Sequence, residues 1–130
     1  MNDLIRIPME QILLFGVGSH AKVVIDILEK QGQYCVAGII DKAPPLQHTL
    51  WNYPWIGDDS DITRLGFVHG VVAIGDNWIR RRVVEKIVAL VPGFKLIIAI
   101  NPSAQIARGV EMSPGTVVMA GACINADARI

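Results

Sequence analysis

A glycine-rich turn near the N-terminus holds the first residues that could do chemistry. Gly16-Val17-Gly18-Ser19-His20-Ala21 has the G-x-G-x-x-A spacing of a dinucleotide-binding turn. Gly16 and Gly18 permit backbone conformations that a Cβ would forbid, and they let a ligand approach the main chain. The helix that follows would offer free N–H groups and a positive dipole end to a phosphate. A nicotinamide dinucleotide and a nucleotide sugar both satisfy this pattern, and a tight turn that needs glycine only for packing is the alternative.

Further polar residues follow expected elements at the same edge. His20 begins a helix, where its imidazole could bond a phosphate or a sugar hydroxyl, or could cap or pack the helix; we do not assign it as a catalytic base. Asp41 closes a strand about twenty residues after the turn, where a dinucleotide site holds ribose hydroxyls and where a solvated turn acid is the alternative. Gly75-Asp76-Asn77 ends another strand at this ligand-binding edge, and Asn77 is also a candidate N-cap.

Two other clusters are better explained by structure than by ligand binding. Arg80, Arg81 and Arg82 resemble a phosphate clamp, but three consecutive helical residues point in three directions, so a solvated helix face is favoured. The aromatic residues of WNYPWIG, at positions 51–57, could stack on a base or sugar ring, but such residues more often pack a loop down. The spacing of histidines, cysteines and acids predicts no metal site.

Hydrophobic periodicity predicts the elements that position these residues. Continuous apolar runs indicate strands buried on both faces, and apolar residues at helical spacing indicate amphipathic helices. The predicted order is a strand over Ile12–Phe15, a helix from His20 to Gly32, a strand over Cys35–Ile40, a loop over Lys42–Asp58, a short helix from Ser60 or Asp61, a strand over Phe67–Ile74, a helix from Asn77 to Val91 and a strand over Lys95–Ile100. These form an α/β domain over residues 1–100, with a small Rossmann-like parallel sheet and helices on its faces.

A six-residue period follows this domain. Counting in sixes from Ile100, the sequence gives Ile106, Met112, Val118, Ile124 and Ile130. The position two residues earlier is small or β-branched throughout, with Ala104, Val110, Thr116, Ala122 and Ala128. The period predicts the first coils of a hexapeptide-repeat parallel β-helix over residues 101–130, with the aliphatic residue inward and three hexapeptides a turn. Because such coils stack on one another, we expect this sequence to be the front part of a longer protein.

Composition excludes several classes of partner. The 130 residues are 52% hydrophobic and 18% charged, with 12 basic and 12 acidic residues and a formal net charge of zero. A nucleic acid or a membrane surface would need a basic face, so we expect neither. Residues 1–10 lack a signal-like apolar segment, and no apolar run reaches the roughly 20 residues that span a bilayer. We therefore expect a cytoplasmic protein in which Cys35 and Cys123 are reduced core thiols.

The order of these motifs resembles the sugar O- and N-acetyltransferases of sialic-acid, bacillosamine and perosamine biosynthesis in bacteria. The similar stretches are GVGSHAKVVIDILE, IIDK, YPWIGDDSDI, VVAIGDNWIRRRV, INPSAQIA and GTVVMAGACINADARI. They extend over nearly the whole chain after residue 11. No single stretch is decisive, but their order and spacing together are highly specific.

The resemblance implies a division of labour between two domains. In that family the Rossmann-like domain binds a nucleotide-activated sugar, and a left-handed β-helix binds acetyl-CoA between neighbouring subunits of a homotrimer. A histidine on a later coil is the general base that helps a sugar amine or hydroxyl attack the thioester. Because no histidine occurs from Asn101 onwards, we expect no catalytic residue within this chain and little of the acetyl-CoA groove.

The resemblance also assigns positions in the sugar-nucleotide site. It places Asp41 and Lys42 near the base and ribose, and the loop at Gly75 beside the sugar. The predicted function is the nucleotide-sugar site of an acetyl-CoA-dependent acetyltransferase that is inactive in this fragment alone. The alternatives are an NAD(P)-binding oxidoreductase domain, against which the six-residue period argues, and a non-catalytic nucleotide-sugar-binding protein. The candidate substrate-binding residues are Gly16, Gly18, Ser19, His20, Asp41, Lys42, Gly57, Gly75, Asp76 and Asn77.

Overall fold

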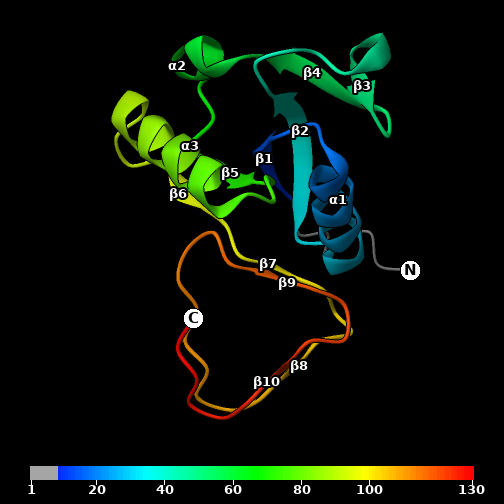
Figure 1. Cartoon of the computed structure of the whole chain (residues 1–130), viewed down its shortest axis with the longest axis vertical. Coiled ribbons are helices and arrows are strands. Elements are labelled where there is room, and N and C mark those ends of the chain that lie inside the picture. Colours follow the sequence, from blue (N-terminus) through cyan, green and yellow to red (C-terminus); the bar gives the residue numbers. More distant parts are fainter. Residues whose placement is uncertain (1–8) are drawn as a thin grey trace, which may run out of the picture.

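A six-stranded sheet with helices on both faces forms the larger part of the molecule (Figure 1). The computed structural model describes residues 9–130, so most of the N-terminal segment that is predicted to lack a secretory signal lies outside the described residues. The strand order is β3-β4-β2-β1-β5-β6, and every pairing is parallel except that of β3 with β4. The elements are β1 (Glu10–Phe15), α1 (Ser19–Gln31), β2 (Tyr34–Ile40), η2 (Leu46–His48), β3 (Thr49–Leu50), β4 (Tyr53–Gly57), η3 (Asp59–Asp61), α2 (Ile62–Leu65), β5 (His69–Val72), α3 (Asn77–Leu90) and β6 (Lys95–Leu96). We call residues 9–97 the sheet region.

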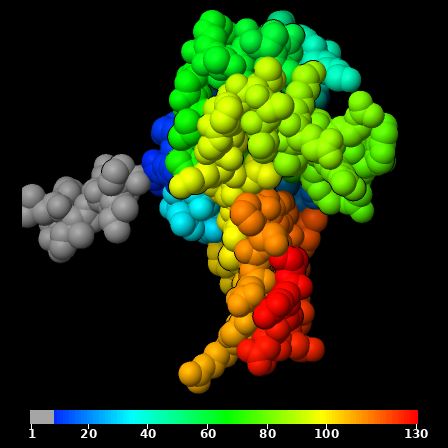
Figure 2. Space-filling model, turned by 90° about the vertical axis from the view of Figure 1, so that its left-hand side faces the viewer, coloured from blue at the N-terminus to red at the C-terminus, as the bar shows by residue number. Residues whose placement is uncertain are grey.

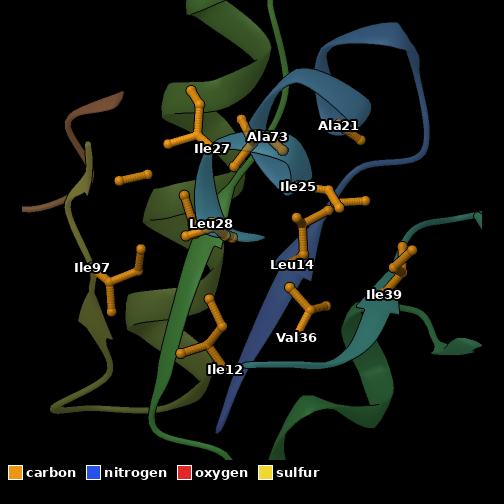
Figure 3. Packing of buried hydrophobic residues seen from close by; sticks show 13 residues of the cluster. Ile12, Leu14, Ala21, Ile25, Ile27, Leu28, Val36, Ile39, Ala73 and Ile97 are labelled. Atoms are coloured by element: carbon orange, nitrogen blue, oxygen red, sulfur yellow. The ribbon is translucent and has the colours of Figure 1, made fainter. Parts of the chain in front are cut away.

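Alternate residues of β1 pack against opposite layers. Ile12 and Leu14 belong to a cluster that α1 covers with residues such as Ile25 and Leu28 (Figure 3). Leu13 and Phe15 face the other layer of the molecule. The buried cluster in that layer also contains Ile40, Ile62, Val72, Ile87 and Phe94. The period of two along a strand explains this division. The central strands are therefore fixed from both sides, and their carboxyl ends lie at one edge of the sheet.

The outer part of the sheet differs from the sequence prediction. The segment Lys42–Asp58, predicted as a loop, contains β3 and β4, and β4 pairs in parallel with β2. Pro54 hides the strand in the sequence because proline cannot donate to a ladder, and here it lies opposite Thr49 of the outermost strand. The predicted strand over Phe67–Ile74 is confined to β5, and the predicted short helix begins as η3 and continues as α2.

The apolar run predicted as one strand over Lys95–Ile100 is two strands with different partners. β6 pairs with β5 in the sheet, whereas β7 (Ala99–Ile100) pairs with β9 (Val117–Val118). Gln31 at the end of α1 contacts the segment around the start of β7: its Nε2 donates to the carbonyl oxygen of Ile98 at 3.4 Å, and its Oε1 accepts from the backbone N–H of Ile100 at 3.2 Å. We call residues 98–130 the coil region.

The coil region traces a triangular path (Figure 1). β7 pairs with β9, β8 (Gln105–Ile106) pairs with β10 (Cys123–Ile124), and Glu111 forms a bridge to Arg129. In each pairing the partners are 18 residues apart and the strands are parallel, as in Gln105 with Cys123. Left-handed backbone recurs every six residues, at Gly109, Gly115, Gly121 and Asp127. The six-residue period of the sequence is thus a period of the backbone, and the region forms coils of a parallel β-helix.

The aliphatic positions of the coils are not equally covered. Val118, in the coil strand pair that lies nearest the sheet region, is 4% exposed, whereas Ile106 and Ile130 are 37% and 47% exposed. Figure 2 shows the coil region as a narrow extension of the broader sheet region. The sequence predicts that the aliphatic residue of each repeat points inward. Val118 is buried as this predicts, but Ile106 and Ile130 remain partly exposed.

The two cysteines differ in burial. Both are free thiols, and Cys35 is half-buried, but Cys123 is exposed. The prediction of a core thiol is therefore wrong for Cys123. Successive residues of a strand point to opposite sides, and on β10 the more buried side is that of Ile124, so Cys123 faces solvent. Between residues 9 and 130, no helix has both the length and the apolar character needed to cross a membrane.

Candidate functional site

A pocket of about 430 Å³ opens at the carboxyl edge of the sheet, where β1, β2 and β5 end. Open α/β sheets bind ligands at this edge, and the volume lies in the range of small-molecule sites. The predicted residues that line it are Gly16, Gly18, Ser19, His20, Asp41, Lys42 and Gly75. Gly57, Asp76 and Asn77 do not line it. The remaining lining residues are Phe15, Val17, Ile40, Asp59, Ala73, Ile74, Ile79 and Val83.

The glycine turn forms one wall of the pocket. Gly16 has φ +127°, and a Cβ there would lie 2.7 Å from the carbonyl oxygen of Ala73, so the close passage of the two segments requires glycine. Gly18 is the N-cap of α1 and makes no side-chain cap, and the first turn of α1 contains no acidic residue. The N–H groups at the start of α1 therefore have no competing carboxylate beside them, which suits an anionic group of a ligand.

The end of β2 supplies the carboxylate on the next wall. The Asp41 N–H donates to the carbonyl oxygen of Gly57 at 3.1 Å, and Trp55 Nε1 donates to the carbonyl oxygen of Asp41 at 3.1 Å. The Asp41 side chain accepts from the N–H of Ala43 at 3.3 Å. Gly57 is therefore behind the pocket, where it holds the backbone of Asp41. Gly57 does not line the pocket, and its predicted role in binding substrate stays a prediction.

Gly57 itself is held against a structured turn. A Cβ at Gly57 would lie 2.3 Å from Oδ2 of Asp61, and that oxygen also accepts from the N–H of Asp58 at 3.0 Å. The hydrogen bond from the Asp58 backbone, followed by that from Arg64, lowers the pKa of the Asp61 carboxyl. Asp61 thus remains ionised and keeps the turn that follows β4 in place.

The loop after β5 differs from the predicted cap. Asp76, not Asn77, is the N-cap of α3, and its Oδ1 accepts from the N–H of Ile79 at 2.9 Å. The expectation of an Asn77 cap is wrong by one residue because both side chains are good caps and adjacent in sequence. Asn77 instead accepts a hydrogen bond from Arg80. Gly75 lines the pocket, and a Cβ there would lie 3.9 Å from the Cβ of His20.

The three consecutive arginines have three different environments. Arg81 pairs with Glu85 on the exposed face of α3, and the guanidinium of Arg82 lies 4.7 Å from the centroid of the Trp78 ring. Arg80 is half-buried and its Nη1 donates to the carbonyl oxygen of Ile74 at 3.2 Å. A solvated helix face therefore describes Arg81 but not Arg80, which fixes the backbone that leads out of β5.

The aromatic residues after β2 pack the outer strands and do not line the pocket. Trp55 lies edge-on to His48 with ring centroids 5.6 Å apart, and Tyr53 donates to Glu29 of α1 at 2.7 Å. Trp51 is half-exposed beside Lys22. Burial, together with the hydrogen bond to Glu29, raises the pKa of Tyr53 to about 12. The packing explanation of these residues is the one that the structure favours.

Sequence reasoning missed three residues that line the far end of the pocket. Ile79 and Val83 lie one turn apart on α3, and Asp59 begins η3 after β4. The spacing of four between Ile79 and Val83 is the signal that could have identified an apolar wall. Asp59 could not have been found in this way because its place depends on β4, which the sequence did not predict.

Another pocket, of about 370 Å³, lies where the sheet region meets the coil region, and we call it the second pocket. It is lined by His20 and Arg80 on one side and by Pro114, Gly115, Thr116, Val117, Met119 and Ile130 on the other. His20 therefore borders both pockets. Among residues 9–130 there is no group of three or more histidine, cysteine or acidic side chains that could hold a metal ion.

Several solved structures that are similar to this chain are acetyltransferases. A variant of perosamine N-acetyltransferase from Caulobacter crescentus in complex with CoA and GDP-perosamine has 37% sequence identity and a TM-score of 0.83 over 95% of this chain. PerB from Caulobacter crescentus, in complex with the same two ligands, has 36% identity and a TM-score of 0.81, again over 95% of the chain and 57% of its own length. The acetyltransferase domain of PglB from Neisseria gonorrhoeae in complex with acetyl coenzyme A has 28% identity and a TM-score of 0.71 over 95% of this chain and 62% of its own.

These comparisons confirm the predicted fold class, a small Rossmann-like parallel sheet followed by the start of a left-handed parallel β-helix. The chain spans 58% of the length of the perosamine N-acetyltransferase structure. Residues 11–87 match the family described as the PglD N-terminal domain. This range is more than half of the chain and includes every residue that lines the pocket at the carboxyl edge of the sheet. The chain therefore belongs to the PglD N-terminal domain family.

Proposed function

We propose that this chain supplies the nucleotide-sugar site of an acetyl-CoA-dependent sugar N-acetyltransferase of bacterial surface-glycan biosynthesis. The observation that carries the proposal is the pocket at the carboxyl edge of the sheet, which joins an uncapped helix N-terminus to the Asp41 carboxylate. The structures described above support it, since the Caulobacter enzymes bind CoA and GDP-perosamine.

The pocket offers a separate group to each part of such a ligand. The N–H groups at the start of α1, with Ser19 and His20, suit the diphosphate. The carboxylate of Asp41 accepts from ribose hydroxyls, and Lys42 beside it adds a positive charge. The sugar then extends past Gly75 and His20 toward the coil region, where His20 also borders the second pocket. With the ligand in this orientation, the amine of the sugar that accepts the acetyl group lies near the coil region.

The reaction of the whole enzyme would be acyl transfer from a thioester to an amine. The sugar nitrogen attacks the acetyl carbonyl carbon, a C–N bond forms, the C–S bond breaks, and the proton lost from the nitrogen ends on the thiol of CoA. No histidine occurs from Asn101 onwards, so the general base is proposed to lie on coils outside this chain. Acetyl-CoA is proposed to bind between hexapeptide-repeat coils of neighbouring subunits in a homotrimer.

The remaining parts of the proposal concern organisation and place in the cell. The division into a nucleotide-sugar-binding domain over residues 1–100 and a β-helix over residues 101–130 stays a proposal. A cytoplasmic location fits an enzyme whose co-substrate is acetyl-CoA. The net charge of zero argues against a nucleic-acid partner. A nicotinamide-dependent oxidoreductase is disfavoured because none of the structures compared above is an oxidoreductase.

A thermal-shift and calorimetric titration tests the proposal directly. The chain is titrated with GDP, UDP, a GDP-linked amino sugar, NAD and acetyl-CoA, since a ligand of the folded state raises the melting temperature by mass action. We expect stabilisation by a nucleoside diphosphate or its amino sugar and none by NAD. Asp41→Asn should weaken that binding, whereas Asp26→Asn on the outer surface of α1 should not. Stabilisation by NAD alone would show that the glycine turn is a dinucleotide site.

A further inference from the structure

The end of the pocket remote from the glycine turn carries its own carboxylate, and we propose that Asp59 uses it to select a guanine nucleotide. This inference rests on the proposed function, because it concerns the base of the nucleotide whose diphosphate lies at α1. It names a specificity-determining residue that neither the glycine turn nor the Asp41 position would indicate.

The topology brings Asp59 to the same edge as the other ligand-binding groups. β4 is the parallel neighbour of β2. Asp59 comes two residues after the end of β4, and Asp41 comes directly after the end of β2. Going outward from β1, the edge therefore presents the diphosphate-binding turn, then Asp41 and Lys42, then Asp59. A nucleotide with its diphosphate at the turn and its ribose at Asp41 extends its base toward Asp59.

The walls at this end of the pocket suit a flat base. Ile40 lines one side, and Ile79 and Val83 line the side formed by α3. Ile79 is 48% exposed. A base between these walls would cover Ile79 and remove apolar surface from water.

The Asp59 carboxylate is fixed and still has capacity to accept. Its Oδ2 lies 2.7 Å from Nζ of Lys86, and the side chain is only 23% exposed. An ionised carboxylate has about four acceptor sites, so one ion pair leaves room for two hydrogen bonds from a ligand. Neighbouring acids are committed elsewhere: Asp58 caps η3 through the N–H of Ser60, and Asp61 binds Arg64. Asp59 is thus the carboxylate of this turn that lines the pocket.

Guanine is the common base that matches a carboxylate best. Its N1–H and N2–H₂ groups lie side by side on one edge and donate in parallel to the two oxygens of a carboxylate, as a guanidinium does. Hypoxanthine keeps the N1–H but lacks the 2-amino group, uracil has a single N–H on its pairing edge, and adenine places a ring-nitrogen acceptor there. Asp59 should therefore prefer GDP over IDP, UDP and ADP.

Calorimetric titration of the full 130-residue chain with GDP, IDP and UDP provides the test. A hydrogen bond to a charged group contributes enough that GDP should bind about tenfold more tightly than IDP. Asp59→Asn turns one acceptor into a donor and should reduce the preference in affinity for GDP over IDP to within about threefold. The two proteins and the two ligands form a double-difference cycle, which isolates the contact with the 2-amino group. Lys86→Gln breaks the same ion pair but keeps the carboxylate, so the ratio should stay near tenfold.

The possible results separate the guanine inference from the proposed function. Equal binding of GDP and UDP by the unaltered chain would overturn the guanine inference while leaving the proposed nucleotide-sugar site intact. A GDP-to-IDP ratio that falls equally in Lys86→Gln and Asp59→Asn would also overturn it, because the ion pair and not the base contact would then set the preference. Binding of NAD with no binding of any nucleoside diphosphate would remove the proposed function itself.

Discussion

The sheet region and the coil region cover their apolar residues in different ways. In the sheet region, β1 lies between β2 and β5 and under helices on both faces, and Ile12, Leu13 and Leu14 are fully buried. In the coil region the strands are two residues long, and Ile106 is 37% exposed. The first region is stabilised by layers that close over a core, whereas the second depends on backbone pairing between coils and on contact with the first.

The largest expected effect comes from opening the core of the sheet region. Leu14→Ala leaves a cavity between β1 and α1 and should lower the free energy of unfolding by about 3 kcal/mol. Ile106→Ala removes a side chain that is already partly in water, and should cost less than about 1 kcal/mol. Urea denaturation followed by circular dichroism measures both. An Ile106→Ala loss as large as that of Leu14→Ala would show that the coils hold a tight core of their own.

Glycines sharpen the comparison because the two regions use them for different reasons. Gly16 combines φ +127° with a carbonyl oxygen that would lie 2.7 Å from a Cβ, whereas Gly121 has φ +71° and no atom within 4 Å of that position. Gly16→Ala should cost about 2 kcal/mol or more, and Gly121→Ala only the left-handed penalty of about 1 kcal/mol.

Gly18 is the control for this pair. It has φ −80°, and nothing lies within 4 Å of an added Cβ, so Gly18→Ala should cost only the loss of a better N-cap residue, below about 1 kcal/mol. Thermal unfolding of the three variants ranks them. If Gly18→Ala destabilised the chain as much as Gly16→Ala, the argument from close approach at Gly16 would be wrong.

The side chain of Gln31 tests how the two regions are coupled. It makes two hydrogen bonds from α1 to the start of the coil region, to the carbonyl of Ile98 and from the N–H of Ile100. Gln31→Ala should cost about 1 kcal/mol. The more specific sign is amide hydrogen exchange. In Gln31→Ala the Ile100 amide should exchange faster than in the unaltered chain, because it loses its acceptor, whereas the exchange rate of the Leu14 amide should not change. Gln105→Ala, at an exposed position of β8, is the matched control and should change neither.

Much of the ligand-binding edge could be predicted because local patterns determine it. The apolar run that ends at Phe15, the glycine turn and the helical period of α1 lie within twenty residues of one another, so each supports the others. The coils were predictable for a similar reason, since a six-residue period in the sequence is also a period of the backbone.

The missed features depend on contacts between distant segments. β4 pairs with β2 although it contains Pro54 and follows a proline-rich stretch, so no local pattern marks it as a strand. The break between β6 and β7 lies inside an apolar run because residues on both sides of it are covered by other elements. Asp59 enters the pocket only through β4, so the base-binding end was outside the reach of sequence patterns.

The smallest expected effect is a pH dependence at the outer edge of the sheet region. Tyr53 on β4 donates to Glu29 on α1, and burial together with this carboxylate raises its pKa from the ordinary value of 10.0 to about 12. A group whose folded-state pKa is raised gives stability that is fully present below pH 10 and is lost as the pH rises toward 12. Tyr34, whose pKa is raised by burial and then by Glu10, acts in the same direction.

Tyr53→Phe should therefore lose a few tenths of a kcal/mol to about 1 kcal/mol at pH 8, where the hydrogen bond to Glu29 is present in the unaltered chain. As the pH rises from 10 toward 12, the unaltered chain should lose more stability than the variant, because the variant has no hydroxyl at position 53 to titrate. Urea midpoints at several pH values measure the two slopes. Since Tyr34 and Tyr53 are the two tyrosines of the chain, Tyr34→Phe provides the matched control, and equal slopes in the unaltered chain and Tyr53→Phe would contradict the raised pKa.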